Sequence, residues 1–401
     1  MKEPIVLAFS GGLDTSFCVP WLKEKYGREV VTVTVDTGGL DDGARLALDE
    51  RSRELGAAKH VLADARNDFF EETLRFLVAG NVLRGNVYPL CVGAERSLQA
   101  RVVAQTARRL GAKAIAHGCT AAGNDQVRFE VALRTLAPEM EIIAPIRDES
   151  LSRQEETRWL NERGFSAGAE RAAYSINRGL WGVTIGGRET TDTVAPLPEA
   201  AWVLTKGAFE APRAPSIHVL GFQKGRPTSI DGKSFDPVTL IETLDALAAP
   251  FGIGRGIHLG DTILGMKGRV AFEAPAATVL ITAHRELEKL TLTARQQRVK
   301  DGLAQVYGDL VHEGQFLEPA CRDIEALFVR SQERVTGTVR LLLRPGALFV
   351  EGVASPHSLK SASRAVYGEA AGEWTPADAR GFSRMLALPG MLHARAAEGS
   401  E

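Results

Sequence analysis

The sequence predicts an α/β protein in which a nucleotide-binding domain with a parallel sheet is followed by an α+β domain and a C-terminal helix. Over the first 165 or so residues, apolar runs typical of strands alternate with helical patterns. That alternation favours a parallel sheet with helices on both faces. Beyond Gly164 the alternation stops and hairpin turn signals become frequent, which indicates a change of domain.

The run Ile5–Phe9 and the segment Ser10–Ser16 directly after it are the most informative stretch of the chain. Five apolar residues without alternation indicate a strand buried on both faces. The next two glycines permit a sharp turn and close approach of a ligand, and the helix that follows attracts anions to its free N–H groups. The pattern is neither a Walker A loop nor a G-x-G-x-x-G dinucleotide loop, yet it predicts phosphate binding. The hydroxyls that could follow phosphate oxygens are those of Ser10, Thr15 and Ser16.

The remaining elements of the first domain continue the same alternation. We expect helices over residues 15–26, 41–55, 67–79, 94–110 and 153–163, and strands over residues 29–35, 60–62, 113–116 and 142–144. Ser152 and Glu155 form a capping-box pattern at the start of the last helix. The residues Asp36-Thr37-Gly38-Gly39 end the second strand at the edge where the phosphate loop also lies. Because ligands of parallel sheets bind beyond the carboxyl ends of the strands, both loops are expected at one site.

Turn signals and two long helical patterns organise the rest of the chain. The turns lie at residues 230–233 and 344–346, and the helical patterns at residues 283–289 and 292–310. A last helix begins near Thr375. We therefore divide the chain into a nucleotide-binding domain (1–168), an α+β domain (169–370) and a C-terminal helix with its tail (371–401).

Composition places the chain among ordinary globular proteins. It has 401 residues, 44% of them hydrophobic and 24% charged, and a net charge of −2, which does not suggest a nucleic-acid partner. Its four cysteines form no CxxC pair, which argues against a zinc site, a disulfide framework or dithiol chemistry. The chain begins without a signal peptide and has no long apolar span, so we expect a cytoplasmic protein with no membrane partner.

A second polar loop, His117–Phe129, follows the expected strand at residues 113–116. In a parallel sheet it reaches the same edge as the phosphate loop. Asn124 and Asp125 can recognise an ammonium and a carboxylate together, and Arg128 offers a planar fork for a carboxylate or phosphate. The alternative is a polar turn whose Asn-Asp pair caps the next helix.

These two segments resemble the signature segments of the argininosuccinate synthase family, within the N-type ATP pyrophosphatases and the adenine nucleotide α-hydrolase-like fold. The first is Val6–Ser16 and the second runs from His117-Gly118 through Gly123–Glu130. The resemblance continues through most of the chain. Further matching segments are Tyr174-Ser175, Leu180-Trp181-Gly182, Gly265–Arg269, Glu273-Ala274-Pro275 and Ser331–Val335.

The resemblance implies a ligase that uses MgATP, L-citrulline and L-aspartate. The ureido oxygen of citrulline would attack the α-phosphate of ATP, releasing diphosphate and forming citrullyl-AMP, and the aspartate amine would then displace AMP. No residue is assigned as a general acid or base, no tightly bound cofactor or metal ligand is expected, and the family's homotetramer is expected here.

By this resemblance the site residues fall into three groups. ATP would contact Ala8, Phe9, Ser10, Gly11, Gly12, Leu13, Asp14, Thr15, Ser16, Val35 and Gly118. Aspartate would contact Thr120, Asn124 and Asp125. Citrulline would contact Tyr88, Asn124, Arg128, Ser175 and Thr184.

The sequence departs from the family pattern chiefly on the citrulline side. A Gly-Lys pair of the second signature is replaced by Ala121-Ala122, and a Gly-Thr-Ser stretch by Cys91-Val92-Gly93. A Glu-Asn-Arg segment is replaced by Gly260-Asp261-Thr262. In addition, Phe272 stands for a Tyr and Gly186 for a Glu.

Three interpretations follow from these departures. Asp261 and Thr262 could compensate for the lost Glu and keep citrulline as substrate, which we favour. Alternatively, the enzyme uses another ureido or carboxamide acceptor, or the chain is a non-catalytic ATP-binding subunit. Cys119 lies within the second loop, but adenylation needs no thiol. Sulfurtransferases that modify tRNA and glutamine-dependent synthetases share the loop, yet the paired cysteines, basic face or glutaminase nucleophile they need are not visible in the sequence.

Overall fold

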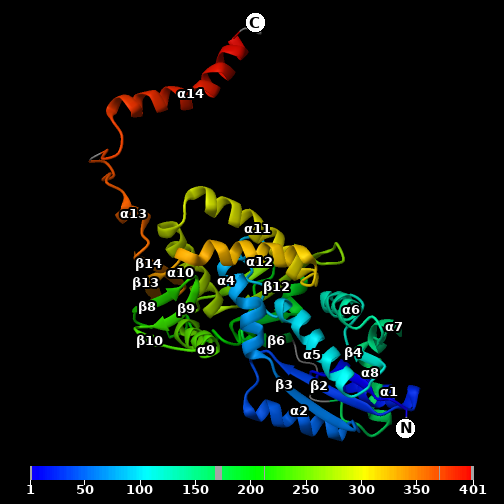
Figure 1. Ribbon diagram of the computed structural model, residues 1–401. Helices are drawn as coiled ribbons and strands as arrows, with labels where there is room; N and C mark the ends of the chain where they lie inside the picture. The colour runs from blue at the N-terminus through cyan, green and yellow to red at the C-terminus, as the bar shows by residue number, and fades with distance from the viewer. Residues whose placement is uncertain (1, 168–173, 212, 370, 399–401) are drawn as a thin grey trace.

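A computed structural model of the chain describes residues 2–167, 174–211, 213–369 and 371–398 (Figure 1). The sheet of the first domain has five parallel strands in the order β3-β2-β1-β4-β5. The strands are β1 (Ile5–Ala8), β2 (Val30–Asp36), β3 (Lys59–Asp64), β4 (Ala114–His117) and β5 (Glu141–Ile143). Ile5 of the central strand aligns with Val30 of β2 and Ala114 of β4. Because all five strands are parallel, the loops after β1, β2 and β4 meet at one edge, as predicted.

Helices cover both faces of this sheet, which explains why the Ile5–Phe9 run is apolar without alternation. Ile5 and Leu7 pack on one face with residues of α1 and α8, whereas Val6 packs on the other face with residues of α5 and α6. The helices are α1 (Leu13–Tyr26), α2 (Asp42–Glu54), α5 (Arg96–Arg109), α6 (Asn124–Leu136), α7 (Pro145–Asp148) and α8 (Arg153–Glu162). The predicted capping box between Ser152 and Glu155 is present at the start of α8.

The helix predicted at residues 67–79 is interrupted. It consists of α3 (Arg66–Phe69), a π-helical turn (Phe70–Leu74) and α4 (Arg75–Gly80). Its aromatic and aliphatic side chains belong to the core of the following domain, and α4 contacts α10, α11 and α12 of that domain. The packing boundary between the two halves of the molecule therefore does not coincide with a single point in the sequence.

Two antiparallel sheets form the second half of the chain. One has the order β11-β12-β7-β6 and the other the order β10-β9-β8-β13-β14. The first contains β6 (Ser175–Gly179), β7 (Gly182–Gly186), β11 (Arg255–Asp261) and β12 (Lys267–Glu273). The second contains β8 (Ser216–Gln223), β9 (Arg226–Ile230), β10 (Lys233–Ser234), β13 (Gly337–Arg344) and β14 (Ala347–Ala354). Both predicted hairpin turns join neighbouring antiparallel strands here, β9 to β10 and β13 to β14.

The helices of this half are α9 (Pro237–Ala248), α10 (Pro275–Thr291), α11 (Ala294–His312) and α12 (Pro319–Ser331). Of these, α9 and α10 contact strands of the second sheet, whereas α11 and α12 pack against each other and against α4. The two long helical patterns in the sequence correspond to α10 and α11, although α10 begins eight residues before the predicted start at residue 283. After the short α13 (Leu359–Ala362), the C-terminal α14 (Pro376–Glu398) extends away from the rest of the molecule (Figure 1). The small-residue stretch 165–173 in the sequence predicts a segment that crosses between the two domains, but most of it lies outside the described residues.

Candidate active site

The loop after β1 leaves backbone donors free at the start of α1. Gly12 is the N-cap and supplies no side-chain cap, so the N–H groups of the first turn lack intrahelical partners. Gly11 has φ +74°, a left-handed conformation that favours glycine. The Ser10 and Thr15 hydroxyls lie 3.2 Å apart across the loop. Together, the free donors and the dipole of α1 suit an anion.

The Ser16 hydroxyl makes its hydrogen bonds within the protein, and Ser16 does not line the cavity next to the loop. Its hydroxyl donates to the Gly11 carbonyl at 3.3 Å and accepts from Arg51 Nε at 3.3 Å. Neither Gly11 nor Ser16 lines the adjacent cavity. The Ser16 hydroxyl therefore has partners within the protein, and its contact with phosphate oxygens stays a prediction.

A cavity of about 780 Å³ opens at the carboxyl ends of β1, β2 and β4. The phosphate loop, the Thr37–Gly39 turn and the loop after β4 form its walls. A Cβ added at Gly118 would lie 3.1 Å from the Thr15 backbone nitrogen, so the two signature loops pack directly against each other. The predicted residues that line this cavity are Ala8, Phe9, Ser10, Gly12, Leu13, Asp14, Thr15, Val35, Gly118, Thr120, Asn124, Asp125, Arg128 and Ser175.

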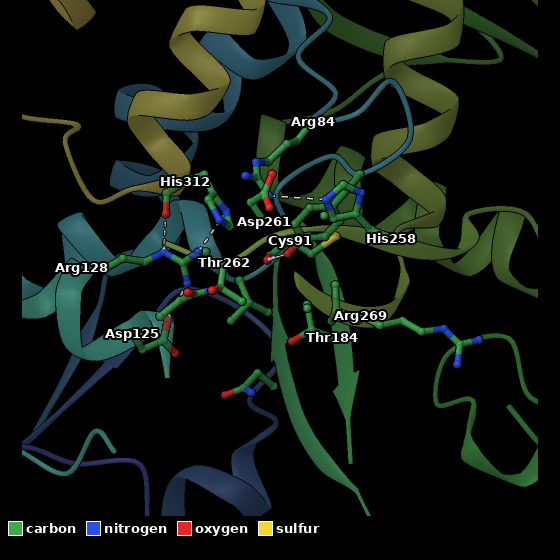
Figure 2. A pocket seen from close by; sticks show the side chains of 18 residues that line it. Arg84, Cys91, Asp125, Arg128, Thr184, His258, Asp261, Thr262, Arg269 and His312 are labelled. Atoms are coloured by element: carbon green, nitrogen blue, oxygen red, sulfur yellow. Dashed lines mark hydrogen bonds and ion pairs between the residues drawn. The ribbon is translucent and has the colours of Figure 1, made fainter. Parts of the chain in front are cut away.

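A second cavity of about 210 Å³ adjoins the first (Figure 2). Both are lined by Asn124, Asp125, Arg128 and Asn177. Tyr88 and Thr184 line only the smaller cavity, whereas Ser175, predicted to act beside them, lines only the larger one. The Tyr88 hydroxyl donates to the Cys91 carbonyl at 2.5 Å, so the ring borders the cavity while the hydroxyl holds its own loop.

Asp125 is a charged residue that lines both cavities. Its carboxylate accepts from Arg96 Nε at 3.1 Å and from Arg128 Nη1 at 2.7 Å. Desolvation alone would raise the pKa of Asp125, but the two guanidinium groups outweigh it and lower the pKa to about 2. Asp125 is therefore ionised at neutral pH and held in one orientation.

The Arg128 guanidinium group is held by Asp125 and His312. Besides its pairing with Asp125, Nε donates to the His312 carbonyl at 2.7 Å and Nη2 faces His312 Nδ1 at 3.1 Å. A Cβ added at Gly93 would lie 3.3 Å from Arg128 Cζ. The Gly at position 93, which departs from the family pattern, therefore leaves room beside this guanidinium group.

The other positions that depart from the family pattern differ in whether they line a cavity. Val92 and Gly260 line the smaller cavity together with Asp261 and Thr262. Phe272 borders it indirectly, because its ring packs against Tyr88 with centroids 5.2 Å apart. Gly186 lines neither cavity. Asp261 forms an ion pair with Lys267 at 2.5 Å, so its carboxylate already has a partner.

Among the charged or imidazole side chains of the site that sequence reasoning missed are Arg84, Glu95, Arg96, His258 and His312. None belongs to a recognisable motif. They reach the site from four separate parts of the fold: the turn after α4, the start of α5, strand β11 and the end of α11. Only tertiary packing brings them together, so a pattern along the sequence could not have found them.

Glu95 is a buried carboxylate at the wall of the larger cavity, 1% exposed. It accepts a hydrogen bond from the Thr37 hydroxyl and lies 3.5 Å from Arg96 Nη1. Burial raises the pKa of Glu95 to about 7, although Arg96 and the Thr37 hydroxyl oppose the shift.

Thiol chemistry finds no support in the geometry. Cys119 lines the larger cavity, but burial raises the pKa of its thiol to about 12, so it is protonated at neutral pH and unreactive. In the described part of the chain, no group of three or more His, Cys, Asp or Glu side chains is arranged to hold a metal ion. The same residues contain no helix that combines the length and apolarity needed to cross a bilayer.

The parallel sheet, its order and the anion-binding loop after its first strand define a nucleotide-binding α/β protein of the HUP class. A family model described as the arginosuccinate synthase N-terminal HUP domain matches residues 4–166, and one described as the arginosuccinate synthase C-terminal domain matches residues 174–393. The chain belongs to the argininosuccinate synthase family.

Curated relatives agree with this assignment over nearly their whole length. The argininosuccinate synthase of Xanthomonas campestris is 41% identical over 98% of this chain and 99% of its own. That of Pyrobaculum aerophilum is 40% identical over 96% of both chains. That of Methanocaldococcus jannaschii is 39% identical over 90% of this chain and 91% of its own.

Proposed function

We propose that this protein is an argininosuccinate synthase, an ATP-dependent carbon–nitrogen ligase. It would convert ATP, L-citrulline and L-aspartate to argininosuccinate, AMP and diphosphate through citrullyl-AMP. The observation that carries the proposal is the meeting of two cavities at Asn124, Asp125 and Arg128, directly beside an anion-binding loop. A nucleotide-sized space and a smaller polar space in contact suit the transfer of an adenylyl group between two bound substrates.

ATP would occupy the larger cavity as its magnesium complex. The free N–H groups of the first turn of α1 would bind phosphate oxygens, and the helix dipole would stabilise the charge that develops on the departing diphosphate. Mg²⁺ would enter with the nucleotide, since this ion is commonly held by substrate phosphates with few protein ligands. Val35 and Gly118 line the cavity near the loop and would border the nucleoside part.

Citrulline would enter the smaller cavity with its ureido group toward the shared wall. Arg128 and Asn124 would orient the ureido oxygen for attack on the α-phosphorus, and Tyr88 and Thr184 would border the aliphatic chain. Ser175 would act from the nucleotide side. Aspartate would bind near Thr120, Asn124 and Asp125, with the ionised Asp125 carboxylate accepting from its amine. No residue is assigned as an acid or base, because orientation of bound reactants alone can supply effective molarities of roughly 10⁵–10⁸ M.

An assay with a panel of acceptors tests the proposal. Purified protein is incubated with MgATP, aspartate and single ureido or carboxamide compounds, and AMP, diphosphate and the ligated product are measured. We expect argininosuccinate with citrulline. Product with another acceptor but not citrulline would contradict the citrulline assignment. ATP binding without turnover for any acceptor would instead indicate the non-catalytic subunit.

The same proposal includes a cytoplasmic homotetramer that uses α14 for assembly. Phe382 and Leu386 of this helix are 68% and 70% exposed in the single chain. Exposed apolar side chains grouped on one helix favour an interface with another molecule. No nucleic acid or membrane is proposed as a partner.

A further inference from the structure

The smaller cavity contains a cationic, donor-rich end that the known site residues do not explain. Arg84, His258 and His312, labelled in Figure 2, line it. The substituted position Gly260 also belongs to the lining. Arg84 comes from the turn after α4, His258 from β11 and His312 from the last turn of α11. The end is therefore assembled from both halves of the molecule.

His312 presents an unused donor. Arginine can only donate, so the contact between Arg128 Nη2 and His312 Nδ1 at 3.1 Å makes Nδ1 the acceptor. Burial and the charges of Arg128 and Arg84 lower the pKa of His312 to about 3, so the ring is neutral and Nε2 carries its one proton. His312 is only 6% exposed, and its Nε2 has no hydrogen-bond partner among the described residues. A buried donor without a partner is a costly arrangement that a ligand's acceptor atom would relieve.

His258 holds Arg84 in place at this end. Its Nε2 accepts from Arg84 Nη1 at 3.4 Å, and its ring stacks on Tyr88 with an interplanar angle of 18°. Gly260 makes this position possible, because a Cβ there would lie 2.5 Å from His258 Nε2. Arg84 keeps further N–H donors for a ligand, since Asp309 is 3.6 Å from its Nε and 62% exposed. The pKa of Asp261 is lowered by the pairing of its carboxylate with Lys267 and also by the charge of Arg84.

The carboxylates that line this cavity already have cationic partners within the protein. The cavity is lined by two, Asp125 and Asp261. Asp125 is bound by Arg96 and Arg128, and Asp261 pairs with Lys267. An α-ammonium group would share either carboxylate with the cations already paired to it, whereas a carboxylate would find the His312 donor without a partner among the described residues and further donors on Arg84.

We propose that this end of the cavity is a carboxylate subsite, in which Arg84 and His312 bind the acceptor and His258 positions Arg84. The protein then selects ω-ureido carboxylic acids by their carboxylate and does not require the α-ammonium group of citrulline. This inference rests on the proposed function and extends it to acceptors without an α-amine. Their reaction is the same: the ureido oxygen bonds to the α-phosphorus as diphosphate leaves. The aspartate amine then adds to the ureido carbon, loses a proton, and AMP departs with the oxygen.

Two truncated acceptors test the specificity. δ-Ureidovalerate is citrulline without its α-amine, and N-carbamoylputrescine is citrulline without its carboxylate. We expect kcat/KM for δ-ureidovalerate to lie within tenfold of that for citrulline, and kcat/KM for N-carbamoylputrescine to fall by about 100-fold or more, as for loss of a charged hydrogen-bond partner. The reverse order would overturn the subsite.

Variants test the residues. Arg84→Gln should raise the KM for citrulline and δ-ureidovalerate by about 10- to 100-fold while leaving the KM for ATP unchanged, and Arg84→Lys should restore part of the loss. His312→Asn keeps an acceptor toward Arg128 but removes the Nε2 donor, so it should raise the acceptor KM more than it lowers kcat. Arg330→Gln, at an exposed arginine on α12, is the matched control. Unchanged acceptor KM in both Arg84→Gln and His312→Asn would contradict the proposal.

Calorimetry separates this inference from the proposed function. Binding of δ-ureidovalerate and N-carbamoylputrescine is measured directly on wild-type and Arg84→Gln protein with ATP present. If no acceptor is turned over, the proposed function fails, but tighter binding of δ-ureidovalerate that is lost in Arg84→Gln would still support the subsite. Equal binding of the two compounds to wild-type protein would overturn it.

Discussion

At the scale of single residues, Asp125 lines both cavities, and its negative charge pairs with the positive charges of Arg96 and Arg128. Its low pKa, set by Arg96 and Arg128, keeps it ionised at every pH at which the enzyme would work. Removing its charge should therefore affect the second half-reaction, in which the aspartate amine is the nucleophile, more than the first.

We predict that Asp125→Asn lowers argininosuccinate formation by about 100-fold or more while ATP binding is nearly retained. The amide keeps the shape of the side chain but cannot hold an ammonium group by charge. Steady-state product formation and nucleotide binding are measured in parallel, with Asp323→Asn on the exposed face of α12 as control. Loss of ATP binding in Asp125→Asn would show that Asp125 belongs to the nucleotide site.

Glu95 gives a pH dependence of stability. Its folded-state pKa of about 7 is above the ordinary value of 4.5, so the folded protein holds a proton that the unfolded chain releases. Stability from this group is present below about pH 4.5 and is lost as the pH rises toward 7. At 1.36 kcal/mol per pKa unit the loss reaches about 3 kcal/mol.

We predict that Glu95→Gln removes this loss. The free energy of unfolding of wild-type protein should fall between pH 5 and pH 8 by up to about 3 kcal/mol more than that of the variant. Urea unfolding at several pH values measures the difference, in which the other titrating groups cancel. Parallel pH profiles for the two proteins would mean that Glu95 is ionised in the folded state at pH 5.

At the scale of elements, the loops after β1 and β4 depend on each other. The Cβ test at Gly118 places an added atom 3.0 Å from Thr15 Cγ2 and 3.1 Å from the Thr15 nitrogen. A side chain there would push the β4 loop away from the start of α1, where the proposed phosphate contacts lie.

We predict that Gly118→Ala raises the KM for ATP by roughly tenfold, equivalent to about 1.4 kcal/mol, with a smaller effect on the citrulline KM. Gly302→Ala on α11 is the control, because an added Cβ there meets nothing within 4 Å. An unchanged KM for ATP would show that phosphates do not contact this junction.

Local patterns predicted the elements that depend on local chemistry. The strand–glycine–helix order at Ile5–Ser16 and the capping box at Ser152 needed only neighbouring residues. The sheet that contains β6, β7, β11 and β12 could not be predicted, since its strands are short, contain glycine, and pair across long stretches of sequence. The π-helical turn at Phe70–Leu74 was missed for a similar reason: its Phe70 and Leu74 side chains are buried in a core that includes residues from distant parts of the chain.

The candidate site likewise has a part that local sequence patterns predicted and a part that depends on residues far apart in the sequence. Apart from Val35 on β2, the predicted ATP and aspartate residues lie in two continuous segments, and most of them line the larger cavity. The acceptor side is built from residues far apart in sequence, such as Arg84 and His312, which no motif connects. The Tyr88 and Ser16 hydroxyls each donate to a backbone carbonyl nearby, a detail that no motif indicates.

At the scale of the whole molecule, the two halves are interlocked. Residues of the first half, among them those of α4, share one hydrophobic core with the second half, and the Asn124 side chain accepts from the Ile263 backbone at 2.9 Å. In contrast, α14 stands apart and has no buried residue, which is the reason for proposing that it packs against other copies of the chain.

We predict that removing residues 371–401 converts the proposed tetramer to a smaller species without unfolding it. Light scattering after size-exclusion chromatography measures the mass, and circular dichroism checks the fold. The double substitution Phe382→Ser and Leu386→Ser should act in the same direction, because it removes apolar area from the exposed face. A tetramer that survives both changes would contradict assembly through α14.

The most direct test of the central claim follows the ureido oxygen. Citrulline labelled with ¹⁸O in the ureido group is incubated with the protein, MgATP and aspartate, and the products are analysed by mass spectrometry. Adenylation of the acceptor predicts one ¹⁸O in AMP, unlabelled diphosphate, and argininosuccinate without the label. Label-free AMP, or label in diphosphate or inorganic phosphate, would contradict the account.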